Sequence, residues 1–178
     1  MYICVKSGYQ AAIMAPTEIL ARQHYHELSS LYPKLGINCE ILTGNTTKKE
    51  RSLIYERLES GDIDVIVGTH ALLSEKVIFS KLAMVVTDEQ HRFGVAQRAS
   101  LKDKSKLSHM LVMSATPIPR TLALSMYGDL DISRLTEMPK GRQKPKTYVV
   151  DESYRERIID FINKQVLSGG QCYIVCPS

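Results

Sequence analysis

Two adjacent carboxylates, Asp88 and Glu89, follow an apolar run at residues 82–86, with Thr87 between. Acids at the end of a buried strand cost free energy unless something uses them. One such use is nucleotide hydrolysis, in which the first acid holds Mg²⁺ on the phosphates and the second positions and polarises the attacking water. For an isolated Asp-Glu pair, solvated acids in a turn would be the better interpretation.

A metal-hydrolase site that combines these acids with His70 or His91 is an alternative. The sequence has no His-Glu-x-x-His motif and no comparable ligand spacing. A zinc hydrolase is therefore a poor fit.

A second polar cluster, Ser114-Ala115-Thr116, follows the apolar run at residues 110–113. Its two hydroxyls could bond the acidic segment and relay the state of a bound nucleotide. Taken alone, the cluster is better explained as an ordinary Ser/Thr entry into a helix, with Pro117 near the first turn.

Three further turns carry small or polar residues after an apolar run, and one of them opens a helix. Helix N-termini and exposed backbone N–H groups bind phosphate well. Each turn alone is only a good cap, but together they would line one sheet edge with phosphate donors. Phosphate contacts carry no sequence information, which suits a protein that moves along any nucleic acid. The residues are Pro16, Thr17, Thr43, Gly44, Thr69 and His70.

Short apolar runs alternate with segments of helical period. The runs are continuous and rich in β-branched residues, as expected for parallel strands covered on both faces. The alternation predicts an α/β fold with a doubly wound parallel sheet, in which functional groups gather at the carboxyl ends of the strands. Strands are expected at 11–14, 39–42, 64–67, 82–86 and 110–113, and helices at 17–28 and 48–58.

The pattern breaks at residues 139–146, where two prolines, a glycine and basic residues indicate a linker. A strand at 147–150, a helix at 152–167 and a strand at 171–176 are expected beyond it. This tail is too small to form a core by itself. We therefore expect a first domain at 1–138, the linker at 139–146, and the beginning of a second domain at 147–178.

Composition adds little to these expectations. The net charge of +4 is compatible with phosphate-backbone binding but does not require it. No apolar run is long enough to cross a bilayer, and the first residues do not form a secretory signal, so a cytoplasmic protein without a membrane partner is expected. The four cysteines lie in apolar stretches and are expected to be buried, reduced thiols. A metal or disulfide pair of Cys172 and Cys176, on the same side of a strand, is the alternative.

The polar segments form an ordered series that resembles superfamily 2 helicases of the DExH type. The series consists of residues 15–21, 42–44, 68–72, 88–95 and 114–121. More narrowly, it resembles the RecG family, ATP-dependent DNA helicases that remodel branched DNA and stalled replication forks. The transcription-repair coupling translocases share parts of the series, but they usually have Glu-Gln where this chain has Gln90-His91.

The resemblance implies a RecA-like lobe of the P-loop NTPase kind, with ATP and Mg²⁺ as cofactors. Asp88 would coordinate Mg²⁺, and Glu89 would be the catalytic base. Gln90 and His91 would couple the ATP site to DNA, with Ser114 and Thr116 as partners on either side of Ala115. The DNA path would run along Pro16, Thr17, Thr43, Gly44, Thr69 and His70. The expected partner is branched DNA, and the parent protein is expected to be a bacterial cytoplasmic monomer.

A nucleotide motor also needs a Gly-x-x-x-x-Gly-Lys-Ser/Thr loop to hold the phosphates. None of the ten glycines is followed by lysine. Residues 1–7 resemble the end of the helix that would follow such a loop, so we expect a truncated first lobe and an inactive fragment. The alternative is a degenerate nucleic-acid-binding module, which would have no reason to keep Asp88 and Glu89.

Overall fold

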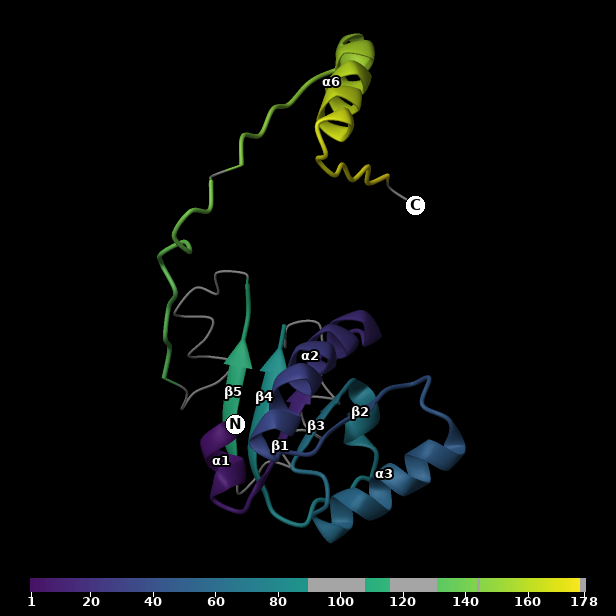
Figure 1. Ribbon diagram of the computed structural model, residues 1–178, viewed down its shortest axis with the longest axis vertical. Coiled ribbons are helices and arrows are strands. Elements are labelled where there is room, and N and C mark those ends of the chain that lie inside the picture. Colours follow the sequence, from purple (N-terminus) through teal and green to yellow (C-terminus); the bar gives the residue numbers. More distant parts are fainter. Residues whose placement is uncertain (90–107, 116–130, 144, 177–178) are drawn as a thin grey trace. The chain divides into compact units, whose positions relative to one another are not determined.

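The computed structural model describes residues 1–89, 108–115, 131–143 and 145–176 (Figure 1). The chain forms two compact units, Met1–Leu130 and Asp131–Ser178. Each unit is described by itself.

The first unit contains a sheet of five parallel strands in the order β2-β3-β1-β4-β5. Every predicted strand of this unit is present, with ends that differ by at most two residues. The strands are β1 (Gln10–Met14), β2 (Cys39–Leu42), β3 (Val65–Gly68), β4 (Leu82–Asp88) and β5 (His109–Met113).

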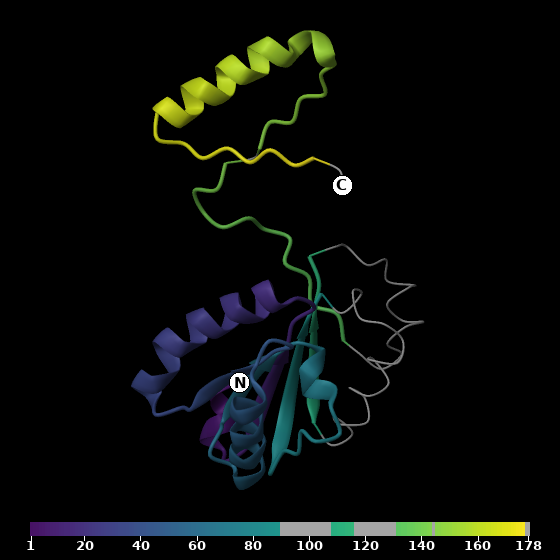
Figure 2. The same ribbon diagram turned by 90° about the vertical axis from the view of Figure 1, so that its right-hand side faces the viewer.

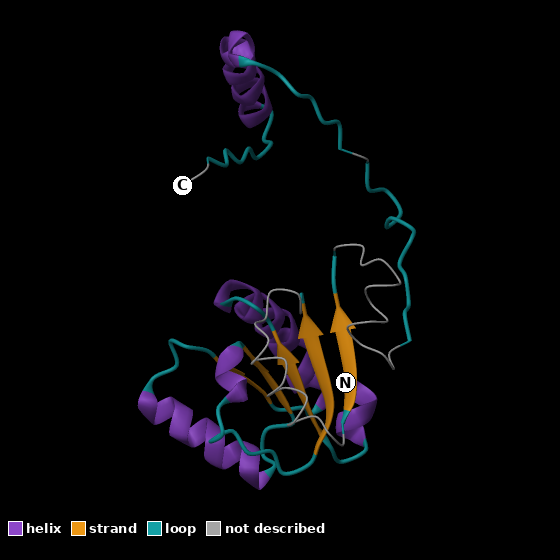
Figure 3. Ribbon diagram, turned by 180° about the vertical axis from the view of Figure 1, so that it is seen from behind, coloured by secondary structure: helices purple, strands orange, loops and turns teal. Residues whose placement is uncertain are grey.

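Helices cover both faces of the sheet, as a doubly wound fold requires (Figures 2 and 3). One face packs against α1 (Tyr2–Lys6) and α2 (Glu18–Leu31), and the other against α3 (Lys48–Ser60) and a 3₁₀ helix at His70–Leu73. Successive side chains of a strand point to opposite faces. Accordingly, Ile13 packs with α2, whereas Ala12 packs with α3.

Local sequence signals fix where the two long helices begin. Thr17 caps α2, because its Oγ1 accepts the Leu20 N–H at 3.4 Å. Thr47 opens α3 with a capping box, in which its hydroxyl accepts the Glu50 N–H and its own N–H donates to the Glu50 carboxylate. Gly61 ends α3 with a φ of 86°, a left-handed conformation that glycine adopts without strain.

A buried glutamine ties the first strand to its neighbours. The Gln10 side chain donates to the carbonyl oxygens of Leu58 and Ile63 and accepts the Lys81 N–H. These contacts join the end of α3 and the segments that lead into β3 and β4. Gln10 therefore sets the amino-terminal edge of the sheet, opposite the predicted site.

The second unit contains α6 (Arg155–Leu167), preceded by a 3₁₀ helix at Glu152–Tyr154. The predicted helix is thus present. The predicted strands at 147–150 and 171–176 are not formed, because a strand needs a hydrogen-bonded neighbour and none lies beside them in the described residues. Cys172 and Cys176 are exposed there, so the expectation of buried thiols is wrong for this pair.

Candidate nucleotide site at the carboxyl edge of the sheet

All five strands run in the same direction, so their carboxyl ends meet at one edge of the sheet. The predicted site residues that the structure describes follow these ends. They are Pro16 and Thr17 after β1, Thr43 and Gly44 after β2, Thr69 and His70 after β3, Asp88 and Glu89 at the end of β4, and Ser114 and Ala115 after β5.

Asp88 is the last residue of β4, and its side chain contacts a helix. Its Oδ2 lies 3.0 Å from Nε2 of His24 on α2. An ionised carboxylate only accepts hydrogen bonds, so the imidazole Nε2 is the donor of this pair. The Asp88 side chain is about one-fifth exposed, at 19%, which leaves it open to a ligand.

Glu89 turns away from β4 in a left-handed backbone conformation, with a φ of 49°. This region is uncommon for residues other than glycine, and such strain is most often found at functional sites. The Glu89 N–H donates to the Met113 carbonyl oxygen at 2.9 Å, so the conformation is held by the neighbouring strand.

The Glu89 side chain meets the predicted cluster after β5. Its Oε1 accepts the Ala115 N–H at 3.0 Å, and its Oε2 lies 3.5 Å from the Ser114 hydroxyl. The two predicted clusters are therefore in contact. Gln90, His91 and Thr116 lie outside the described residues.

The residues of the predicted phosphate-binding turns differ in solvent exposure. Thr17, Gly44 and His70 are exposed, whereas Thr43 and Thr69 are buried. The N–H groups of the two buried threonines also have internal acceptors, the Thr46 hydroxyl and the Leu42 carbonyl oxygen. The exposed residues can reach a ligand directly, while the buried threonines shape the turns.

The turn after β2 is held by an arginine on α3. Nη2 of Arg51 lies 3.1 to 3.2 Å from the carbonyl oxygens of Thr43, Gly44 and Thr46. Asn45 in this turn donates to Glu18 at 2.7 Å, which joins the turn to the start of α2. The Arg22 guanidinium bonds the same carboxylate and, with the Asn45 amide, lowers the pKa of Glu18.

Gly68 at the end of β3 leaves no room for a side chain. A Cβ there would collide with the Leu42 carbonyl oxygen and lie 2.8 Å from Cγ of Leu72. The glycine therefore allows β2 and the 3₁₀ helix to approach β3, which positions Thr69 and His70.

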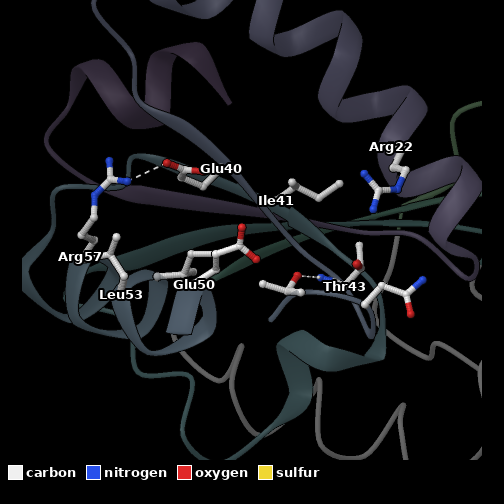
Figure 4. A pocket seen from close by; sticks show the side chains of 10 residues that line it. Arg22, Glu40, Ile41, Thr43, Glu50, Leu53 and Arg57 are labelled. Carbon is white, nitrogen blue, oxygen red and sulfur yellow. Dashed lines mark hydrogen bonds and ion pairs between the residues drawn. The ribbon is translucent and has the colours of Figure 1, made fainter. Parts of the chain in front are cut away.

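A pocket of about 300 Å³ lies beside β2, lined by α2, the turn after β2 and α3 (Figure 4). Arg57 and Glu40 in its wall form an ion pair at 2.6 Å, and Arg22 is paired with Glu18. The lining does not include Asp88 or Glu89. This pocket is separate from the predicted nucleotide site.

The donor set at the edge fits Mg²⁺ held through bound phosphates. The described residues contain no group of three or more His, Cys, Asp or Glu side chains that could hold a metal ion by themselves. Mg²⁺ is usually bound by one or two carboxylates together with substrate phosphates and water. Asp88 can serve in that way, because one of its oxygens has a protein partner and the other has none among the described residues.

Sequence reasoning missed three residues that organise this edge: His24, Arg51 and Glu18. The signal for His24 was available. It lies three residues after Ala21 and four before Leu28, on the stripe of α2 that packs against the sheet. A polar residue on such a stripe needs a partner. No comparable signal existed for Arg51, whose contacts depend on the path of the turn.

Within the described residues, no helix is long and apolar enough to span a membrane.

Comparison with known proteins identifies relatives over almost the whole chain. RecG, described as an ATP-dependent DNA helicase, is 48% identical over 177 residues in Bacillus subtilis and 49% identical over 175 residues in Aquifex aeolicus. These matches cover 99% and 97% of this chain but only 26% and 22% of the relatives. The chain thus spans about a quarter of their length.

The fold is also similar to solved structures. A structure of RecG bound to a three-way DNA junction matches 96% of this chain and 23% of its own, with a TM-score of 0.76 and 44% identity. Mycobacterium smegmatis helicase Lhr, bound to single-stranded DNA and AMP-PNP, matches 75% of this chain and 19% of its own, with a TM-score of 0.52 and 16% identity. The second likeness concerns the fold alone.

The family profile of the DEAD/DEAH box helicases matches residues 2–124, which include the five strands and both acidic and hydroxyl clusters. The chain belongs to the DEAD/DEAH box helicase family and is similar over nearly its whole length to the helicase region of RecG.

Proposed function

We propose that this chain is part of an ATP-dependent DNA helicase of the RecG kind, which remodels branched DNA in recombination and repair. One observation carries the proposal. The Asp88-Glu89 pair at the end of β4 contacts the Ser114-Ala115 cluster after β5, in a chain 48% identical to RecG. Neither the pair nor the cluster would be informative alone, whereas their contact unites two separate sequence motifs in one site.

In this proposal the two carboxylates have separate roles. Asp88 holds Mg²⁺, which neutralises charge on the phosphates when ATP is bound. Glu89 orients the attacking water and accepts its proton. Ser114 and Ala115 hold the Glu89 carboxylate, so a shift of the segment after β5 would move the catalytic base. Gln90, His91 and Thr116 would extend this coupling toward DNA.

The proposed DNA contacts lie along the same edge of the sheet. Thr17, Gly44 and His70 are exposed and able to meet a nucleic-acid backbone directly. Pro16, Thr43 and Thr69 would support them by fixing the turns. The relative whose structure was solved on a three-way junction supports branched DNA as the ligand.

We further propose that the sheet continues beyond β5 in the parent protein. In the described residues β5 pairs with β4 on one side only, and its Leu111 side chain is 46% exposed. A strand that leads into a phosphate-binding loop would cover this edge and complete a RecA-like lobe. Residues 1–138 would then be most of the first lobe, 139–146 the linker, and 147–178 the beginning of the second lobe.

The chain by itself is expected to have no meaningful ATPase or unwinding activity. It keeps the water-activating acids but has no Gly-Lys sequence to hold the terminal phosphates. The test is ATP turnover by the purified chain, measured with and without forked DNA. DNA-stimulated hydrolysis by the chain would overturn this expectation.

The reading frame upstream of Met1 separates the truncated helicase from a degenerate DNA-binding module. A Gly-Lys-Thr type loop a short distance upstream supports the proposal. A true start codon at Met1 supports the degenerate module. If the loop is present, preference of the encoded protein for branched DNA over a transcription complex argues against a transcription-repair coupling translocase.

A further inference from the structure

The contact between His24 and Asp88 joins a helix to the end of the central β4 strand. Nε2 of His24 lies 3.0 Å from Oδ2 of Asp88, across 64 positions of sequence. Both side chains are mostly covered, with 26% and 19% of their surfaces exposed. Among the described residues, His24 is the hydrogen-bonding partner of the Asp88 side chain.

His24 lies on the side of α2 that packs against the sheet. His24 follows the fully buried Ala21 by three residues and precedes Leu28 by four, so it lies on the stripe that packs against the sheet. Tyr25 and Leu28 pack against the same cluster. A shift of the α2 backbone at His24 would disturb this packing.

The hydrogen bond from His24 uses one carboxylate oxygen of Asp88, and the other oxygen has no partner among the described residues. A monodentate metal contact needs only one oxygen, so the hydrogen bond and the metal can be accommodated together. Carboxylates that bind metals are commonly oriented by such outer hydrogen bonds, and loss of the outer partner typically weakens metal binding or activity 10- to 100-fold.

We propose that His24 is a positioning residue for the metal-binding carboxylate of Asp88. Its Nε2–H holds Oδ2 against α2, which leaves Oδ1 as the oxygen that would hold the metal. The inference rests on the proposed role of Asp88 in binding Mg²⁺. It adds to the site a residue of α2, the helix whose first turn faces the proposed DNA path.

The test uses the protein that the uninterrupted reading frame encodes, with saturating ADP and with Mn²⁺ as a paramagnetic probe, because Asp88 is proposed to hold the ion together with bound phosphates. Mn²⁺ bound at Asp88 broadens the backbone amide signals of Thr87 and Glu89 in proton–nitrogen NMR spectra. His24→Ala is expected to raise the Mn²⁺ concentration for half-broadening by about 10-fold or more. His24→Gln places an amide donor at a similar reach, so it is expected to restore most of the loss.

His26→Ala is the matched control, because His26 is exposed on the same helix. It is expected to leave the titration unchanged. Asp88→Asn is expected to raise the half-broadening concentration at least as far as His24→Ala does, which ties the signal to this carboxylate. Equal thermal unfolding midpoints show that the variants fold alike. If His24→Ala does not fold, His24→Phe retains a ring of similar width without the donor and takes its place.

The outcomes separate the inference from the proposed function. Equal half-broadening in wild type and His24→Ala overturns the positioning role while Asp88 remains a metal ligand. Tighter binding by His24→Ala also overturns it, because His24 would then compete with the metal. Absence of broadening in the wild type removes the metal role of Asp88 and the inference with it.

A second measurement examines the hydrogen bond without metal. The ring nitrogens of His24, assigned by comparison with His24→Gln, are expected to show a proton on Nε2 in the wild type, because Nε2 faces the Asp88 carboxylate. Asp88→Asn is expected to change this pattern. An identical pattern in wild type and Asp88→Asn would contradict the contact on which the inference is built.

Discussion

At the scale of the residue, neighbouring side chains in the Asp88-Glu89 pair contact different parts of the fold. Asp88 contacts α2 through His24, and Glu89 contacts the segment after β5 through Ala115. The left-handed backbone of Glu89 accompanies this divergence. Two adjacent acids can thus have different chemical roles, because their surroundings rather than their identities distinguish them.

The cysteine thiols also differ in burial. Burial raises the pKa of Cys39 to about 12, so this thiol stays protonated at neutral pH. Cys172 and Cys176 are exposed. None of the three has a geometry in the structure that indicates a metal or catalytic role.

The capping box of α3 predicts a pH dependence of stability. Hydrogen bonds from the Thr47 hydroxyl and N–H lower the pKa of Glu50 in the folded chain. A lowered folded-state pKa contributes stability that is present above the unfolded pKa, about 4.3, and is lost as the pH falls through the folded value. Glu50→Gln should therefore destabilise the chain at pH 6 and have a smaller effect near pH 3.

The measurement is urea unfolding followed by circular dichroism at both pH values. Glu59→Gln is the control, since Glu59 is exposed at the other end of α3. If Glu50→Gln changed the free energy of unfolding equally at the two pH values, the lowered pKa of Glu50 would be contradicted.

At the scale of the element, the turns after the strands depend on close packing behind them. Gly68→Ala is expected to lower the free energy of unfolding by about 1–3 kcal/mol, because the added Cβ overpacks a full site. The atoms it would meet are the Leu42 carbonyl oxygen and Cγ of Leu72. Urea unfolding measures the change.

Gly44→Ala is the matched control for Gly68→Ala. A Cβ at Gly44 meets nothing within 4 Å, so its effect on stability should be small. Equal losses of stability in the two variants would show that the tight fit at Gly68 is not the cause.

The sequence predicted the elements well where local patterns decide the structure. Short, mostly apolar runs identified the five strands of the described sheet, and Thr17 and Thr47 marked the helix starts. The parallel direction then placed the acids and hydroxyls at one edge. These inferences depend on the period of each segment and on the alternation of strands with helices, and both can be read from the sequence.

The contacts within that edge could not be predicted in the same way. The pairing of His24 with Asp88 depends on how α2 lies across the sheet, and the hold of Arg51 on the turn after β2 depends on the path of that turn. The tail shows that a local pattern does not suffice to form a strand. Residues 147–150 and 171–176 have strand-like sequences, but a strand is formed only beside a partner.

At the scale of the whole molecule, the proposed continuation of the second unit makes a direct prediction. Tyr148, Val149 and residues 173–175 expose large apolar side chains. In the uninterrupted protein these segments should pair as strands and bury that surface. Hydrogen exchange should be fast at 171–176 in the 178-residue chain and at least 100-fold slower in the longer protein, a change of about 2.7 kcal/mol in opening free energy.

Strand β1 provides the internal control for this exchange experiment. The amides of β1 are paired on both sides and should be protected in both lengths of chain. Fast exchange at 171–176 in the longer protein would contradict the assignment of this tail to a second lobe.

The central claim is that the acids at the end of β4 serve ATP hydrolysis in a longer DNA helicase. Its most direct test is ATP turnover by the protein that the uninterrupted reading frame encodes, with and without three-way junction DNA, in wild type and Glu89→Gln. Junction DNA is expected to stimulate turnover, and Glu89→Gln is expected to lower it by 100-fold or more, about 2.7 kcal/mol of barrier, while junction binding is retained. Turnover unchanged by Glu89→Gln would contradict the claim.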